Sequence, residues 1–147
     1  MSTETRAKSV STADISRHAA AALVDAVRAR AAEIGFTVAT VVTDAGGHLK
    51  AFERDDDAPF LAAEVAVDKA WTAASFRIAT HVWNDYLADP RISPLAGHPR
   101  LMAVGGGYPI IEDDRVIGGL GISGGTFEQD QRAAEAALTS LGFQTPA

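Results

Sequence analysis

The stretch from Gly105 to Asp130 constrains the fold more than any other part of the chain. Eight of the 13 glycines in the chain lie in this stretch, several of them alternating with Val, Leu and Ile. Glycine in a strand-like pattern lets the backbone come close to another strand, a neighbouring subunit or a bound small molecule. Thr126, followed by Gln129 three positions later, forms a capping-box pattern that predicts the start of a helix. We therefore expect closely packed strands that lead into a helix.

The rest of the chain predicts an α+β domain in which helices pack on an antiparallel sheet. Turn-forming residues at 44–47 and 113–114 each separate two runs of strand-forming residues, which predicts two hairpins. The predicted helices cover Thr12 or Asp14 to Ile34, 59–78, 80–88 and 126–141, and the predicted strands cover 36–43, 48–54, 101–104, 108–112 and 115–122. The resulting order is α-β-β-α-α-β-β-β-α. Hairpins without repeated βαβ units favour an antiparallel sheet.

Composition and charge exclude several classes of protein. The chain of 147 residues fits one domain, and its formal net charge of −6 argues against nucleic acid or an anionic membrane as the main partner. No cysteine is present, so disulfides and cysteine metal sites are excluded. The first ten residues are polar and lack the apolar core of a secretory signal, and no apolar run approaches the roughly 20 residues that span a bilayer. We expect a cytoplasmic protein with a flexible arm at residues 1–11 and a single domain at 12–147.

Lys69 is an irregularity in the helix predicted over residues 59–78. At 100° per residue it projects into a face formed by small and apolar residues, among them Leu61, Val65 and Phe76. A lysine in such a place reaches toward solvent, pairs with a carboxylate or contacts a ligand. Lysine is almost never fully buried unless it is paired, which favours a structural role for Lys69 over contact with a ligand.

The glycines at 119–124 match the G-x-G-x-x-G string of dinucleotide-binding proteins. Such a fold needs a further parallel strand with an acidic residue about 20 positions on, and the chain ends 23 residues after Gly124. The dinucleotide interpretation is therefore rejected. Two interpretations of Ser123-Gly124-Gly125 stay equally open: backbone N–H groups at a helix start that bind an anion or carboxylate, and a tight turn packed against a neighbour.

No metal site is predicted. The Asp55-Asp56-Asp57 run lacks the spacing of a calcium loop and is better explained by capping of the following helix. The four histidines, at positions 18, 48, 81 and 98, are well separated. His81, next to Thr80 and near Arg77, lies where two predicted helices meet, a place where histidine is more often an ordinary polar residue than a ligand.

Four sequence blocks, in this order along the chain, resemble the GlcG/HbpS-like family. They are Val42–Leu49 with Phe52–Arg54, Lys69–Ala74, Gly106–Ile110 (which contains Gly107 and Pro109), and Val116–Gly125 with Glu128–Asp130. The resemblance covers about Thr12 to Leu141 and extends to the C-terminal domain of PduO-type cobalamin adenosyltransferases.

The resemblance implies a profilin-like α+β fold with a five-stranded antiparallel sheet, and a homo-oligomer, often an octamer. Some members of the family bind haem, and others have undefined roles in small-molecule catabolism. Thr80 matches a threonine of the family that has been linked to haem coordination, and His81 beside it offers a stronger ligand.

Three hypotheses about function follow. The first is an oligomeric protein that binds haem, a corrinoid or another small molecule. The second is a cofactor-free lyase or isomerase that acts on a small carboxylated or aromatic compound, with Lys69 as base or carboxylate anchor. The third is a non-catalytic assembly protein. The candidate catalytic residues are Lys69, His48 and Asp130, and the candidate binding residues are Arg54, Phe76, Arg77, Thr80, His81, Gly106, Gly107, Pro109, Ser123, Gly124 and Gly125.

Overall fold

The structure is a computed structural model that describes residues 6–146. Its strands are β1 (Ala39–Asp44), β2 (Leu49–Arg54), β3 (Gly107–Glu112) and β4 (Arg115–Ser123), and its α-helices are α1 (Arg17–Ile34), α2 (Phe60–Phe76), α3 (Trp83–Leu87) and α4 (Phe127–Ser140). Two 3-10 helices, η1 (Thr80–Val82) and η2 (Ser93–Gly97), flank α3. The α+β class is confirmed.

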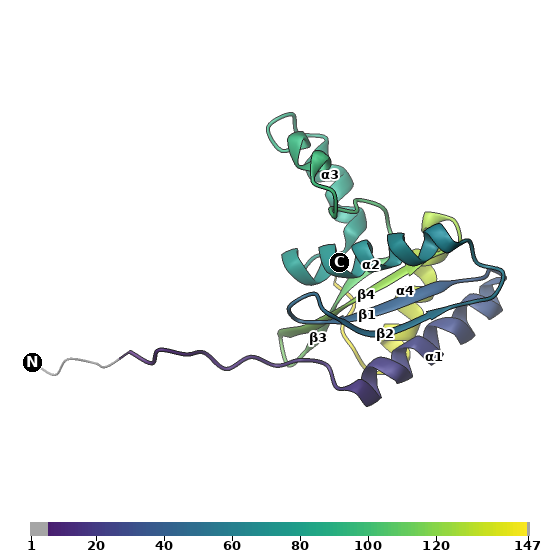
Figure 1. Ribbon diagram of the computed structural model, residues 1–147, viewed down its shortest axis with the longest axis horizontal. Coiled ribbons are helices and arrows are strands. Elements are labelled where there is room, and N and C mark those ends of the chain that lie inside the picture. The colour runs from purple at the N-terminus through teal and green to yellow at the C-terminus, as the bar shows by residue number, and fades with distance from the viewer. Residues whose placement is uncertain (1–5, 147) are drawn as a thin grey trace, which may run out of the picture.

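The strands form one antiparallel sheet in the order β2-β1-β4-β3. Helix α2 covers one face of the sheet, and α1 and α4 cover the other (Figure 1). The main core lies between the sheet and the α1–α4 layer, and a smaller cluster of Ala39, Val41 and three alanines of α2 lies on the opposite face. The central strands β1 and β4 are thus mostly buried on both sides, whereas the edge strand β2 is largely exposed.

The sheet of the described residues has four strands, so the prediction of five strands is not met. Residues 101–104, predicted as a strand, form an irregular segment. Two threonine hydroxyl groups satisfy the backbone of this segment where a neighbouring strand would otherwise do so. The Thr72 hydroxyl donates to Arg100 O (3.0 Å) and accepts from Met102 N (3.0 Å), and the Thr80 hydroxyl donates to Val104 O (2.6 Å).

Helix α1 starts later than the sequence predicted. Ser16 is its N-cap and accepts a hydrogen bond from Ala19 N at 3.0 Å. Asp14, one of the two predicted starts of this helix, instead accepts from Ala45 N at 2.9 Å and ties the start of the domain to the β1–β2 turn. The predicted end of the helix at Ile34 is confirmed, since the next residue, Gly35, has a φ of 102° and closes the helix onto Ala31 O.

Glycines bring α2 very close to β4. A Cβ atom added to Gly121 would lie 1.9 Å from Ala66 O, which is far inside any contact distance. Small residues on both sides of this contact, Gly121 on the strand and Ala66 and Ala70 on the helix, therefore set the separation of the two layers. The glycine density of the sequence serves close packing within the chain at this place.

Two segments extend beyond the compact body. The N-terminal segment runs to one side, and the segment around α3 stands away from the sheet (Figure 1). Residues 6–12 are exposed and contain no helix or strand, whereas residues 1–5 of the predicted arm lie outside the described part of the chain. The flexibility of the arm and the domain limits stay predictions.

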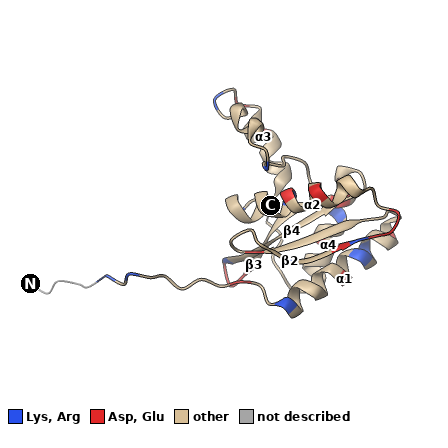
Figure 2. Ribbon diagram, viewed as in Figure 1, with Lys and Arg blue, Asp and Glu red and all other residues tan. Residues whose placement is uncertain are grey.

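Charged residues are spread over distant parts of the molecule. Figure 2 shows Lys and Arg on the N-terminal segment, on α1 and near α3, with Asp and Glu on α2 and in the loops. Between residues 6 and 146, no helix combines the length and the apolar character needed to cross a membrane.

Candidate functional site

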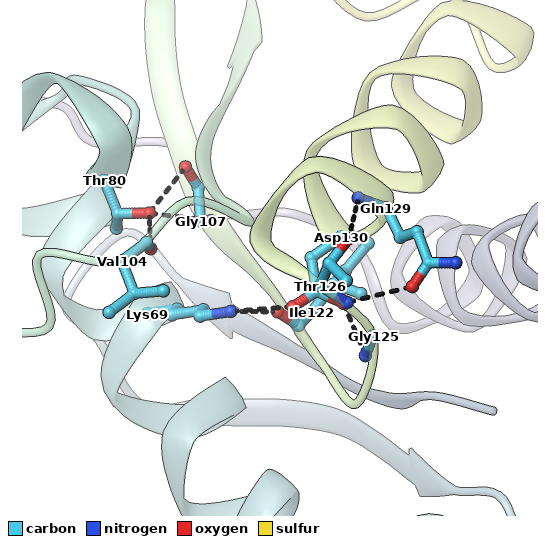
Figure 3. A network of polar contacts seen from close by, with 9 residues as sticks. All are labelled: Lys69, Thr80, Val104, Gly107, Ile122, Gly125, Thr126, Gln129 and Asp130. Atoms are coloured by element: carbon cyan, nitrogen blue, oxygen red, sulfur yellow. Dashed lines mark hydrogen bonds and ion pairs between the residues drawn. The ribbon is translucent and has the colours of Figure 1, made fainter. Parts of the chain in front are cut away.

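Lys69 forms a buried ion pair with Asp130. Its Nζ donates to Asp130 Oδ2 at 3.1 Å and to the backbone oxygen of Ile122 at 2.7 Å (Figure 3). The side chain of Lys69 is 1% exposed and that of Asp130 is 3% exposed. The pair therefore joins α2, the end of β4 and the first turn of α4 inside the protein.

The burial of this pair sets its electrostatics. Burial lowers the pKa of Lys69, against the attraction of Asp130, and burial raises the pKa of Asp130, against the attraction of Lys69. Each charge is tolerated in the interior because the other is present. The structure brings together two of the three predicted catalytic residues, and their burial favours a structural ion pair.

The glycine turn before α4 is anchored to the same pair. Gly125 N donates to Asp130 Oδ1 at 3.1 Å, and Thr126 N donates to the side chain of Gln129 at 2.9 Å. The Thr126 hydroxyl accepts from Gln129 N at 3.1 Å, so the predicted capping box is confirmed. These backbone donors are used within the chain. Of the two interpretations left open for this turn, the geometry favours the tight packed turn over the anion site.

Gly106 and Gly107 lie between the ion pair and Thr80. A Cβ atom on Gly106 would lie 3.0 Å from Lys69 Nζ and 2.7 Å from Ile122 O. A Cβ atom on Gly107 would lie 2.4 Å from Thr80 Cγ2. Both residues are buried and make room for the side chains that hold this region together.

Thr80 holds the start of β3. Its hydroxyl donates to Val104 O at 2.6 Å and accepts from Gly107 N at 2.9 Å (Figure 3). The side chain is fully buried. A hydroxyl engaged in this way serves the fold, so His81 is the better placed of the two neighbours for contact with a ligand.

His81 and the end of α2 form a more accessible group. The His81 ring is half-buried, lies 6.0 Å from the ring of Tyr108 between centroids, and has a buried Nδ1 without a hydrogen-bond partner among the described residues. Phe76 is 56% exposed, and Arg77, exposed as well, ends α2 with a φ of 62°. Six consecutive positions of the chain, 76–81, thus provide an imidazole, an aromatic ring and a guanidinium group.

The other candidate residues lie elsewhere. His48 is exposed and contacts Asp44 at 3.1 Å, and Arg54 donates to Ala58 O at 2.5 Å, so both side chains have partners in or just after the β1–β2 hairpin. Pro109 is buried in β3, and Ser123 is the last residue of β4. Among the described residues, no hydrogen bond or ion pair joins His48 or Arg54 to Lys69.

Gly124 and Gly125 border a broad, open depression of about 890 Å³ between the end of α1 and the start of α4. Arg28 is the cation that lines it, and this side chain already pairs with Glu53 and Asp25. Because Arg28 is already paired, its charge is not free to bind an anion in this depression. No three His, Asp or Glu side chains gather into a potential metal site in the part of the chain that the structure describes.

An aromatic hollow was missed by reasoning from sequence. It has a volume of about 120 Å³ and is lined by Trp71, Phe76, Trp83, Leu95, His98 and Leu101. We call these six residues the aromatic hollow. Its one visible signal in the sequence is that the only two tryptophans of the chain, Trp71 and Trp83, both belong to it.

Comparison with known proteins agrees with the four sequence blocks. The model of the family described as haem degrading protein HbpS-like matches residues 15–139. The chain belongs to this family. Among its relatives, an uncharacterized 15.0 kDa protein of Citrobacter freundii is 39% identical over 135 residues, which are 89% of this chain and 94% of that protein. Protein GlcG of Escherichia coli is 35% identical over 109 residues, 74% of this chain and 81% of GlcG.

Two solved structures of related proteins have the same fold. Klebsiella pneumoniae protein ORFY superposes with a TM-score of 0.87 and 33% identity, over 92% of this chain and 96% of that one. A complex described as PduOC:Heme superposes with a TM-score of 0.82 and 33% identity, over 91% of this chain and 99% of that one. The predicted resemblance to GlcG, HbpS and PduO is therefore confirmed, and with it the assignment to a family with haem-binding members.

Proposed function

We propose that this protein is a small-molecule-binding homo-oligomer and that haem is the first ligand to test. The observation that carries the proposal is the Nδ1 of His81, which has no hydrogen-bond partner among the described residues, in a half-buried ring five positions after the exposed Phe76 and four after the exposed Arg77. The similarity to a haem-bound relative, 33% identical over 91% of this chain, supports the same ligand class. The octamer and the cytoplasmic location predicted from the sequence are part of this proposal.

In this proposal, residues at the end of α2 and just after it would hold the haem. His81 would supply an imidazole ligand, Phe76 would contact the flat face of the macrocycle, and Arg77 would pair with a propionate. When bound, haem supplies a redox-active iron. The chain contributes the ligand nitrogen, the apolar contact and the countercharge.

The proposal is tested by titrating the purified protein with haemin and recording the Soret band. We expect a saturable shift of the band with the wild-type protein. His81→Ala should move the band and weaken binding at least about tenfold, which corresponds to about 1.4 kcal/mol. His18→Ala, which removes an exposed histidine of α1, is the matched control and should leave the titration unchanged.

Two results would contradict the proposed ligand, and a third would contradict the oligomer. One is the absence of a saturable Soret shift. The other is an identical titration for His81→Ala and wild type, which would remove His81 as a ligand. A mass of the native protein equal to that of one chain, 15.3 kDa, would contradict the oligomer.

A further inference from the structure

The aromatic hollow has the size and walls of a site for a single aromatic ring. Its volume is about 120 Å³, and cavities of about 150 Å³ with apolar walls bind benzene in other proteins. Phe76 meets Trp83 edge to face at 4.8 Å between centroids, and Trp71 stacks on His98 at 5.7 Å. A further aromatic ring in the hollow would make edge-to-face or stacked contacts of the same kind with these side chains.

Trp83 adds an unsatisfied donor to these walls. Its side chain is almost completely buried, at 2% exposure, and its indole nitrogen has no hydrogen-bond acceptor among residues 6–146. A buried N–H without an acceptor is destabilising. Because this nitrogen is itself buried behind the surface of the hollow, the accessible polar contact for a bound molecule lies at the edge of the hollow.

Arg100 places positive charge beside the hollow. Its guanidinium carbon lies 4.4 Å from the ring centre of Trp71, and its Nε lies 3.5 Å from Asp68, a long contact for an ion pair. The side chain is 42% exposed, so its other nitrogens are available. A guanidinium group binds a carboxylate through two parallel hydrogen bonds, which gives the site a preference for an anion at its edge.

From the aromatic walls and the positive charge beside them we propose that the aromatic hollow binds a monocyclic aromatic carboxylate, with the ring between Trp71 and Trp83 and the carboxylate at Arg100. This site differs from the proposed haem site, because His81 does not line the hollow. Phe76 belongs to both proposals, so neither proposal is tested by a substitution of Phe76.

The two tryptophans provide the readout. Trp71 and Trp83 are the only tryptophans of the chain and both line the hollow, so the intrinsic fluorescence reports on this site. We would titrate the full chain with benzoate, with benzyl alcohol as a neutral ring and with cyclohexanecarboxylate as a non-aromatic anion. We expect a saturable change with benzoate, and binding at least about tenfold weaker for the other two compounds, because each lacks one of the two recognised groups.

Substitutions separate the ring from the charge. Arg100→Gln should weaken benzoate at least about tenfold and leave benzyl alcohol unchanged, whereas Arg91→Gln, an exposed arginine of the same projecting segment, should change neither. Leu95→Phe should fill the hollow and abolish binding of both rings. Circular dichroism of each variant confirms that it is folded.

Three results would overturn the proposal. The first is the absence of a saturable response to benzoate up to tens of millimolar, and the second is an equal affinity of Arg100→Gln and Arg91→Gln for benzoate. The third is a tryptophan emission that changes on dilution at the same concentrations at which the native mass changes. The last result would show that a second copy of the chain covers the hollow. Haem binding that depends on His81 is unaffected by each of these outcomes, so the two proposals fail independently.

Discussion

Lys69 organises its surroundings through two contacts of one ammonium group. It closes the end of β4 through Ile122 O and fixes the first turn of α4 through Asp130, which in turn holds the backbone of Gly125. A single side chain of α2 thereby connects this helix to two other elements, through residues that lie 53 and 61 positions further along the chain. Its importance is in the position of the glycine turn and of α4, whatever ligand the protein binds.

We predict that Lys69→Met destabilises the protein by about 3–5 kcal/mol, because it leaves the Asp130 carboxylate buried without a partner. Lys69→Met combined with Asp130→Leu should recover part of this loss, since it removes both charges. The measurement is urea unfolding at a fixed protein concentration, which keeps any oligomerisation constant. Lys50→Met, at an exposed lysine of β2, is the control and should change stability little. A Lys69→Met protein as stable as wild type would show that the pair does not hold the fold.

Asp44 gives the β1–β2 turn a dependence on pH. Burial acts to raise its pKa, but hydrogen bonds to Oδ1 from His48 N (3.0 Å), Gly46 N (3.0 Å) and His48 Nδ1 (3.1 Å) together hold the pKa below the ordinary value of 3.8. A carboxyl group with a lowered pKa in the folded state stabilises the protein above its unfolded pKa. That contribution is lost as the pH falls through the folded value.

We therefore predict that Asp44→Ala destabilises the protein by about 1–3 kcal/mol at neutral pH and that the loss shrinks below pH 3.8. Unfolding curves collected from about pH 7 down to the acid range check this. His48→Ala removes only the ring contact and should have a smaller effect. A loss of stability that is the same at every pH would contradict the proposed role of the carboxylate.

At the scale of elements, the contact between α2 and β4 depends on the absence of side-chain atoms. Ala66 and Ala70 of the helix approach the strand where Gly121 has no Cβ. The helix and the strand both belong to a close-packed interior that has no space for an added methyl group. This contact fixes α2, and with it the position of Lys69.

We predict that Gly121→Ala destabilises the protein by about 3 kcal/mol or more, because its Cβ would lie 1.9 Å from a backbone oxygen that cannot move alone. Gly97→Ala is the matched control, since nothing lies within 4 Å of the added atom there. Thermal unfolding of the two variants measures the difference. Equal melting temperatures would show that the layers can separate without loss.

Local signals allowed most elements to be predicted, and long-range contacts explain the failures. The capping box at Thr126 and Gln129 and the end of the first helix at Ile34, just before a glycine, rest on short-range patterns, and the structure confirms both. The strand predicted over residues 101–104 failed because Thr72 and Thr80, far away in sequence, satisfy that backbone. Lys69 was recognised as irregular from its helical face, but no spacing rule identifies Asp130 as its partner across 61 residues.

At the scale of the whole molecule, apolar side chains remain exposed on several surfaces. Phe60, at the start of α2, is 82% exposed, and Phe127, at the start of α4, is 55% exposed. Large contiguous apolar patches are typical of surfaces that meet another protein, whereas single exposed apolar residues are common on any protein surface. Phe60, the more exposed of the two, is therefore the residue at which we test the proposed homo-oligomer.

We predict that the native protein has a mass that is a multiple of 15.3 kDa and that Phe60→Glu shifts the population toward a single chain. Light scattering coupled to size-exclusion chromatography measures both. Gln144→Glu adds the same single charge at an exposed position near the C-terminus and should leave the mass unchanged. If Phe60→Glu behaves as this control does, Phe60 lies outside the interface.

The way in which Thr72 and Thr80 hold the segment from Arg100 to Gly107 has a consequence for how this family can change. The threonine hydroxyls form hydrogen bonds with backbone atoms, which every amino acid carries. The side chains of Arg100 and Val104, one half-buried and the other exposed, take no part in these hydrogen bonds. Mutation can thus rewrite the chemistry at the rim of the aromatic hollow while the scaffold keeps its shape, which makes this segment a natural place for related proteins to diverge in what they recognise.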